Sequence, residues 1–357
     1  MHKLLQSLAR RLMPLLLMAA AVGAAAAPVY RAHVVAAPYR LGGVEYFWYT
    51  AMGLNNQGQS LLTTYQYGAF GLGYAVYDKH GQYLRHVGGM SRYGSNLIQA
   101  INNHGDVAGH ELEGYYWVGH VQKDQGFDAT VHGFPEGDFG GYFSDAYAYG
   151  LSDAGHVVGQ AVGALDGRQR AYVWRLGTMQ EIGTFGGATS TAVDVSDQGV
   201  AVGQADLADG SVHAFAFRGG LLHDLGTLGG ANSWARAIND RGQIAGTAET
   251  ADGTQRAFLY EKRQMRALPT PEGASASAWS INRQGQVVGS YTLAGQGHAF
   301  LFDGGTVHRI QDLLRPVDQA VWTIAGASAI NDKGWILVDA HKAGDLNSTV
   351  LLLKPAR

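Results

Sequence analysis

The sequence contains no cysteine, and only 15% of its residues are charged, against about 25% in ordinary soluble proteins. The absence of cysteine excludes disulfides, thiolate catalysis and cysteine metal ligands. The chain has 26 Lys and Arg and 29 Asp and Glu, a formal net charge of −3. Because there is no basic surplus, we expect no nucleic-acid partner.

Proline is scarce, with 8 residues, whereas the 51 glycines make up one residue in seven. This glycine content is roughly twice the usual share. Without a strict three-residue period it excludes a collagen-like chain and indicates many tight turns. With 46% hydrophobic residues over 357 positions, the chain can build a large core without disulfides.

The first 27 residues differ from the rest. Lys3, Arg10 and Arg11 precede an apolar run, 12–21, and four small residues, 24–27, follow it. This order is typical of a cleavable secretory signal peptide. An uncleaved anchor is the alternative, but the run is shorter than the ~20 residues of a membrane span. We expect a signal peptide over 1–27 and a periplasmic or secreted mature chain, 28–357, with no membrane span.

One unit recurs seven times along the mature chain. Each copy has a turn that begins with a short polar residue and ends in glycine, and the glycines lie 43 to 50 residues apart. The polar residues are Asn55, Asn102, Ser152, Ser196, Asn239, Asn282 and Asn331. Such side chains accept a hydrogen bond from the backbone two residues on, and glycine supplies the left-handed conformation that the turn needs.

Each unit also contains four apolar segments of about five residues, bounded by Gly, Asn or Asp. Examples are 235–238 before the turn, 243–246 after it, 257–260, and 222–226 of the preceding unit. These segments are typical of strands. Four short strands at a period of 40 to 50 residues predict a blade of a β-propeller. We therefore predict an all-β, single-domain, seven-bladed β-propeller, or six or eight blades if an end unit is incomplete or split.

The third segment of each unit is apolar on both faces, with Ala alternating with large aromatic residues, as in 214–217 and 257–260. A blade covered by two neighbours requires this pattern. A glycine also recurs at one position of the second segment, where we expect an approach too close for a side chain. The five glycines are Gly109, Gly159, Gly203, Gly246 and Gly289.

The last unit has no fourth strand after its apolar segment 349–353, whereas Tyr30–Val34 resembles one. We expect the N-terminal segment to supply the outer strand of the last blade and close the ring. Two units carry extra sequence, over 120–149 and 315–324. Insertions in repeat proteins map to loops, where binding residues often lie, although simple drift between copies explains them as well.

The copies contain motifs of a known family. His213-Ala214-Phe215 and His298-Ala299-Phe300, with a Leu-Gly-Thr-Leu-Gly-Gly stretch at 225–230 and an Ala-Ile-Asn-Asp-x-Gly stretch at 237–242, resemble the bacterial HAF repeat, a probable extracellular repeat. The match is strong over roughly 175–310 and weaker elsewhere. The resemblance implies an exported repeat protein, with no catalytic residues or substrate to carry over.

The sequence contains no recognisable catalytic motif, and we expect no catalytic residue, no metal site and no cofactor. Positions that vary between copies are better candidates for function. One lies three residues before the first residue of each turn, where the copies have Met52, Gln99, Tyr149, Val193, Arg236, Trp279 and Ser328. If this strand is innermost, we expect the position to face the central channel or an open face. Gln99, Tyr149, Arg236 and Trp279 suit a glycan or peptide, because they combine aromatic surfaces with hydrogen-bond donors.

We favour a monomeric, noncatalytic module that binds a glycan, a peptide or a partner protein, or acts as a scaffold. A propeller hydrolase or lyase acting on a polysaccharide is the alternative; it needs a carboxylate pair or a metal cluster at the channel mouth. A structural surface protein without a small ligand is a third reading.

Overall fold

The computed structural model describes residues 27–37, 40–41, 44–45, 47–66, 72–87, 96–113, 116–124, 128–131, 145–162, 167–345 and 348–356. Residues 1–26 of the expected signal peptide, and 125–127 and 132–144 of the longer second unit, lie outside these ranges. Within the described part, no helix is both long and apolar enough to cross a bilayer.

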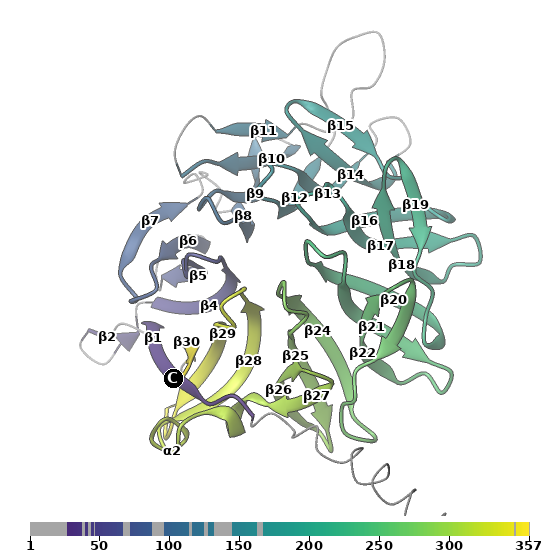
Figure 1. The fold of residues 1–357 in the computed structure, drawn as a ribbon. Coiled ribbons are helices and arrows are strands. Elements are labelled where there is room, and N and C mark those ends of the chain that lie inside the picture. Colours follow the sequence, from purple (N-terminus) through teal and green to yellow (C-terminus); the bar gives the residue numbers. More distant parts are fainter. Residues whose placement is uncertain are drawn as a thin grey trace, which may run out of the picture.

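Seven four-stranded antiparallel sheets stand around a central axis like the blades of a propeller (Figure 1). Blade one comprises β4 (Phe47–Leu54), β5 (Ser60–Gln66), β6 (Leu72–Tyr77) and β7 (Tyr83–Val87). Blade two comprises β8 (Asn96–Ile101), β9 (Val107–Glu113), β10 (Tyr116–Gln122) and β11 (Ala129–Val131). Blade three comprises β12 (Ala146–Leu151), β13 (Val157–Val162), β14 (Gln169–Arg175) and β15 (Thr178–Glu181).

The next three blades repeat the same order from the axis outwards. Blade four comprises β16 (Gly186–Val195), β17 (Ala201–Leu207), β18 (Val212–Arg218) and β19 (Leu221–Asp224). Blade five comprises β20 (Gly229–Ile238), β21 (Ile244–Thr250), β22 (Gln255–Glu261) and β23 (Gln264–Ala267). Blade six comprises β24 (Ser275–Ile281), β25 (Val287–Leu293), β26 (Gln296–Asp303) and β27 (Thr306–Arg309). The prediction of a seven-bladed propeller is confirmed.

Blade seven joins the two ends of the chain. Its inner strands are β28 (Trp322–Ile330), β29 (Ile336–Lys342) and β30 (Ser348–Pro355), and its outer strand is β1 (Tyr30–Ala36). β1 pairs antiparallel with β30, from Tyr30 opposite Pro355 to Ala36 opposite Val350. The predicted closure of the ring by the N-terminal segment is confirmed. A two-stranded ribbon, β2 (Arg40–Leu41) with β3 (Val44–Glu45), follows β1.

The extra sequence of unit seven helps to hold β1 in place. It contains the 3₁₀ helix η1 (Ile310–Leu313) and the short helix α2 (Pro316–Gln319). The backbone N–H of Arg315 donates to the carbonyl oxygen of Tyr30 at 3.0 Å. The N–H of Ala32 donates to Asp318 Oδ2 at 3.3 Å, and Tyr30 is buried against Ile310 and neighbouring apolar side chains. In the described structure this insertion therefore supports the closing strand.

The hydrophobic core is divided into seven clusters, one between each pair of neighbouring blades. One cluster joins blades seven and one, so the ring has no open side. On the third strands, both the small and the large residue are buried, as in Ala214 and Phe215 of β18. The alternation of Ala with aromatic residues therefore fills both faces of each blade.

The recurrent glycines of the second strands lie beneath the innermost strand. A Cβ atom added at Gly159 would overlap the carbonyl oxygen of Tyr147, and one added at Gly246 would overlap that of Trp234. Gly109, Gly203 and Gly289 face equivalent carbonyl oxygens of their own blades. The prediction of a close backbone approach is confirmed at all five positions.

Candidate binding site

A cavity of about 310 Å³ lies on the propeller axis, where the turns after the innermost strands of all seven blades meet. We call it the channel cavity. The innermost strands β4, β8, β12, β16, β20, β24 and β28 supply its wall, and the turns that follow them supply its rim. The sequence repeat thus places one copy of the same strand and turn from every blade around a single space.

Each innermost strand contains a β-bulge three residues before the first residue of its turn. The pairing register shifts there, which leaves one extra residue without a partner on the second strand. The seven extra residues are Met52, Gln99, Tyr149, Val193, Arg236, Trp279 and Ser328, and all of them line the channel cavity. A bulge re-aims a side chain. Of the two placements expected for these variable positions, the channel and an open face, the structure shows the channel.

Arg236 and Trp279 form a pair across blades five and six. The guanidinium carbon of Arg236 lies 5.6 Å from the centre of the Trp279 ring, within the range of a cation–π contact. The indole Nε1–H donates to Ser290 Oγ at 3.2 Å. The Trp279 side chain is nevertheless 42% exposed, so an aromatic surface and a cation are held together beside open space.

Tyr149 is held by an aromatic cluster on blades two and three. The centroid of its ring lies 6.3 Å from that of Tyr147 in a stacked arrangement and 5.8 Å from that of His110 in a T-shaped arrangement. Burial lowers the pKa of His110 to about 4, so this imidazole is neutral at pH 7. Burial, together with the nearby Tyr147, raises the pKa of Tyr149 to about 12. The Tyr149 hydroxyl is therefore a neutral hydrogen-bonding group, and Gln99 lines the same cavity from blade two.

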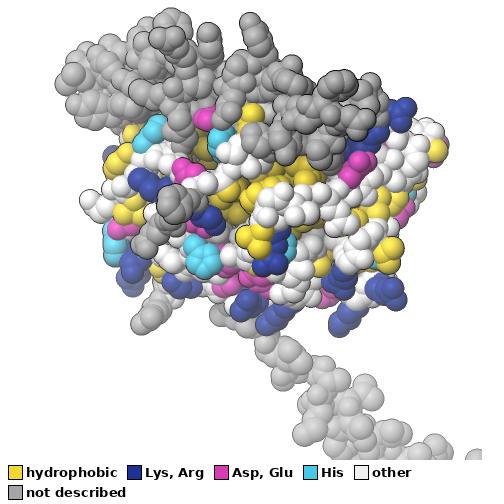
Figure 2. All heavy atoms as spheres, turned by 90° about the horizontal axis from the view of Figure 1, so that it is seen from above, with side chains coloured by type: hydrophobic (Ala, Val, Ile, Leu, Met, Phe, Trp, Pro, Cys, Tyr) yellow, Lys and Arg dark blue, Asp and Glu magenta, His cyan; other side chains and the backbone are white. Residues whose placement is uncertain are grey.

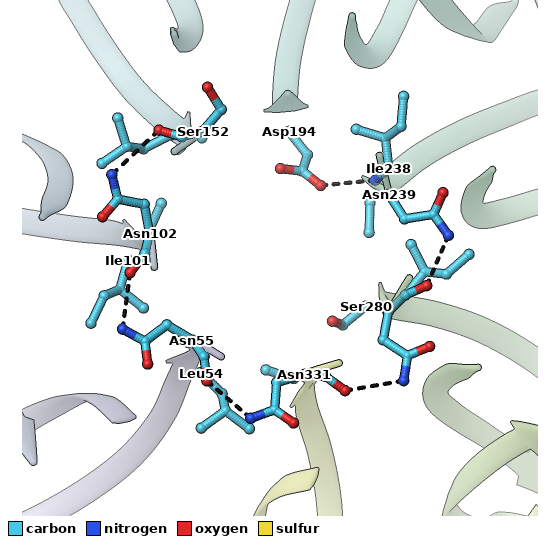
Figure 3. A pocket seen from close by; sticks show the side chains of 18 of the residues that line it. Leu54, Asn55, Ile101, Asn102, Ser152, Asp194, Ile238, Asn239, Ser280 and Asn331 are labelled. Atoms are coloured by element: carbon cyan, nitrogen blue, oxygen red, sulfur yellow. Dashed lines mark hydrogen bonds between the residues drawn. The ribbon is translucent and has the colours of Figure 1, made fainter. Parts of the chain in front are cut away.

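The asparagines that begin the turns connect successive blades around the rim (Figure 3). The Nδ2–H of Asn55 donates to the carbonyl oxygen of Asn102 at 2.9 Å, and that of Asn102 donates to the carbonyl of Ser152 at 3.3 Å. The same bond leads from Asn239 to Asn282, from Asn282 to Asn331, and from Asn331 back to Asn55, at 2.8 to 3.0 Å. Each of these asparagines also accepts backbone N–H bonds of its own turn through Oδ1.

Where serine replaces asparagine, carboxylates make the connections between blades. Ser152 and Ser196 accept backbone N–H bonds of their own turns, but a hydroxyl is too short to reach the next blade as an amide does. Instead Asp197 Oδ1 accepts from Ala154 N of blade three. Asp194 Oδ2 accepts from Ile238 N of blade five at 2.8 Å, a bond drawn in Figure 3.

The remaining rim carboxylates are engaged in the same way. Asp153 accepts from the backbone and side-chain amides of Asn103 at 2.6 and 2.7 Å. Asp240 accepts from Asp197 N and from the Arg283 guanidinium, and Asp332 accepts from Arg283 N and Asn56 Nδ2. The acids that line the cavity are thus used to join blades.

The channel cavity is acidic. Its lining includes Asp153, Asp194, Asp197, Asp240 and Asp332 but only two basic residues, Arg236 and Arg283. Burial raises the pKa of Asp194 to about 6, and burial together with Asp240 and Asp153 raises the pKa of Asp197. The repulsion between these carboxylates favours neutral or cationic ligands over acidic ones. Within the described ranges, no group of three His, Cys, Asp or Glu side chains could hold a metal ion.

Sequence reasoning found the lining residues but missed the connecting role of the turn asparagines. The available signal was the amide itself, which stands in five of seven copies where a serine is enough to close the turn. An amide both accepts and donates hydrogen bonds. The sequence interpretation assigned a partner to the amide oxygen of each turn but none to the amide N–H.

No family model matches the chain, and no curated protein sequence matches it. Solved structures do. The β-propeller domain of the Trilobed protease from Pyrococcus furiosus superposes with a TM-score of 0.56 at 9% identity, over 87% of this chain and 95% of that one. That propeller has an open Velcro topology, whereas here β1 pairs with β30.

A structure from a study of two prolyl endopeptidases superposes with a TM-score of 0.53 at 12% identity, over 92% of this chain. This chain spans about half of that one, since 50% of it is covered. At such identities the likeness extends to the fold and not to the activity. By its strands, its closure and these likenesses, the chain is a β-propeller of seven blades.

Proposed function

We propose that this protein is an exported, noncatalytic propeller of the HAF-repeat type that binds a glycan or peptide at the channel cavity. The observation that carries the proposal is the set of bulge residues. Seven equivalent positions face one cavity and differ in every copy, whereas the neighbouring core and turn residues recur. Variation at the lining of a shared cavity is expected where a repeat scaffold carries a specific ligand.

The chemistry of the lining supports a binding role for these side chains. Arg236 over Trp279 offers a cation beside a partly exposed aromatic face, and Tyr149 adds a neutral hydroxyl on a supported ring. Sugar rings and peptide side chains stack on such faces and hydrogen-bond to such groups. The acidic rim selects neutral or cationic ligands.

The same geometry makes the hydrolase or lyase alternative less favourable. A glycosidase needs two carboxyl groups free to exchange protons or to attack the substrate. Here Asp153, Asp194 and Asp240 each accept two hydrogen bonds within the scaffold. Their positions are explained by the links between blades.

The proposal is tested with the double variant Arg236→Ala and Trp279→Ala. On arrays of neutral, basic and acidic glycans and peptides, we expect the unmodified protein to bind a neutral or basic member and the variant to bind it about tenfold more weakly or not at all. The matched control is Leu176→Ala with Arg266→Ala, two exposed residues outside the cavity lining. Unchanged binding by the Arg236/Trp279 variant would dismiss this site.

A further inference from the structure

A groove runs between blades four and five, away from the channel axis. Its outer part is a cavity of about 480 Å³ lined by 13 residues of the two blades. A second cavity, of about 420 Å³, shares Val200, Arg218, Arg241 and Gly242 with it and extends to Asp240 on the channel rim. The two cavities therefore form one elongated depression, which we call the inter-blade groove. Each part is within the ~300–1,000 Å³ usual for ligand sites.

Four cations line the inter-blade groove. Arg218 ends β18, Arg241 lies in the turn after β20, and Lys262 and Arg263 form the turn between β22 and β23. All four side chains are exposed, and within the described part of the chain none of them forms an ion pair with a carboxylate. The nearby carboxylates are engaged elsewhere: Asp224 with His213 at 2.8 Å, and Glu261 with Arg266 at 2.7 Å.

The apolar floor of the groove offers a face for stacking. Tyr260 is half-buried, and Leu225, Ile238 and Ile244 are buried beside it. Seen edge-on, Lys and Arg side chains lie along the lower rim of the molecule, with Asp and Glu side chains between them (Figure 2). The groove itself is lined by these four cations and by two carboxylates, Asp224 and Asp240, whereas the chain as a whole has a formal net charge of −3.

The turn that carries two of these cations has a backbone that normally requires glycine. Lys262 and Arg263 have φ angles of +52° and +65°. In blades four and six, the corresponding turns have Gly219-Gly220 and Gly304-Gly305. Side chains other than glycine are strained in this conformation. Blade three has Leu176 with a φ of +50° followed by Gly177, so blade five alone among blades three to six has side chains other than glycine at both positions, and both of them are cations.

We propose that the inter-blade groove binds an acidic polysaccharide, a sugar chain bearing carboxylate, sulfate or phosphate groups. Four unpaired cations supply the attraction, the elongated shape fits a chain, and the Tyr260 ring packs against a sugar face. The inner end of the groove shares Ser196 and Asp240 with the lining of the channel cavity, whereas its four cations lie outside that lining and are opposite to it in charge. A nucleic acid is the other polyanion to be tested, and the lack of a basic surplus over the whole chain argues against it.

The test compares the unmodified protein with the double variant Lys262→Gly and Arg263→Gly, which copies the turn of blade four. Its probe is a fluorescently labelled oligogalacturonate, and binding is followed by fluorescence anisotropy at two salt concentrations. We expect the variant to bind about tenfold more weakly, while its melting temperature stays the same or rises because the strain is relieved. Rising salt should weaken binding to the unmodified protein.

Matched controls separate this proposal from general charge attraction. Lys342→Ala removes an exposed cation of β29 in blade seven, outside the lining of the groove, and it should leave binding unchanged. A methyl-esterified oligogalacturonate of the same length lacks the charges and should not bind.

The proposal is overturned if the labelled oligomer does not bind, or if the Gly variant binds it as well as the unmodified protein. It is equally overturned if a single-stranded oligonucleotide or vesicles of anionic lipid bind as tightly through Lys262 and Arg263. Because the Arg236/Trp279 variant keeps the groove intact, failure of the channel proposal and failure of this one give different results.

Discussion

At the scale of the residue, each turn asparagine forms hydrogen bonds both within its own turn and to the next blade. Oδ1 of Asn282 accepts the N–H groups of Gln284 and Gln286 within its own turn, and Nδ2 donates to the carbonyl of Asn331 in the next blade. The side chain is buried, with 3% of its surface exposed. A buried donor or acceptor that loses its partner costs about 1–3 kcal/mol. The amide therefore contributes to the stability of the ring as well as to the turn.

The variant Asn282→Ser tests this second role. Serine keeps an acceptor for the turn, as Ser152 does naturally, but loses the bond to blade seven. We expect the free energy of unfolding to fall by about 1–3 kcal/mol, measured by denaturant titration. Ser211→Ala, a change on an exposed hydrogen bond of the β17–β18 turn, is the control and should cost less. Equal stability of Asn282→Ser and the unmodified protein would show that the link between blades contributes nothing.

At the scale of the element, the bulge of the innermost strand and the glycine of the second strand belong together. In blade five the register shifts between Ala235 and Ala237, and Gly246 pairs with Ala235 directly before the shift. The carbonyl of Trp234 lies where a Cβ of Gly246 would stand. The bulge directs Arg236 towards the channel, and the glycine leaves room for the bent backbone.

We therefore expect Gly246→Ala to destabilise the protein by about 1–3 kcal/mol, because the added methyl group overlaps backbone that must shift. Thermal unfolding measures the effect. Gly297→Ala is the matched control, since Gly297 of β26 has a non-positive φ and open space around its Cβ position. That change should be neutral or slightly stabilising, by about 0.4–1 kcal/mol. If the two variants have the same melting temperature, the close approach at Gly246 has no energetic consequence.

At the scale of the whole molecule, one strand from the N-terminus completes the ring. β1 covers the outer edge of β30, and its residues Tyr30, Val35 and Ala36 are buried. The interface of blades seven and one contains Val35 and Ala36 as core members. Without β1, the hydrogen-bonding edge of β30 would be open, and exposed edges promote aggregation.

Deletion of residues 28–38 should consequently lower the melting temperature sharply and favour self-association. The comparison is between chains that begin at Pro28 and at Tyr39, measured by calorimetry and by size-exclusion chromatography. A shortened chain that melts at the same temperature and stays monomeric would contradict a stabilising role for the closure.

Much of this architecture was predictable because each copy of the repeat contains its own turn, strand and glycine signals. The turn at 239–242, the strand at 257–260 and the glycine at position 246 recur in the other units, and local propensity and burial pattern depend on few neighbours. Even the pairing of β1 with β30 followed from counting strands, since one copy lacked its fourth strand and the N-terminus had one to spare. Chain length, composition and repeat thus determined the strands, the number of blades and the closure.

Only the tertiary structure decided which side chains meet. Arg236 and Trp279 are 43 residues apart and form a pair because the ring brings two bulges side by side. The link from Asn331 to Asn55 spans 276 residues, and the inter-blade groove combines residues of β18 with a turn of the next blade. The repeat pattern encodes contacts within a blade. Contacts between blades depend on the angle and spacing at which seven sheets close, which no single copy contains.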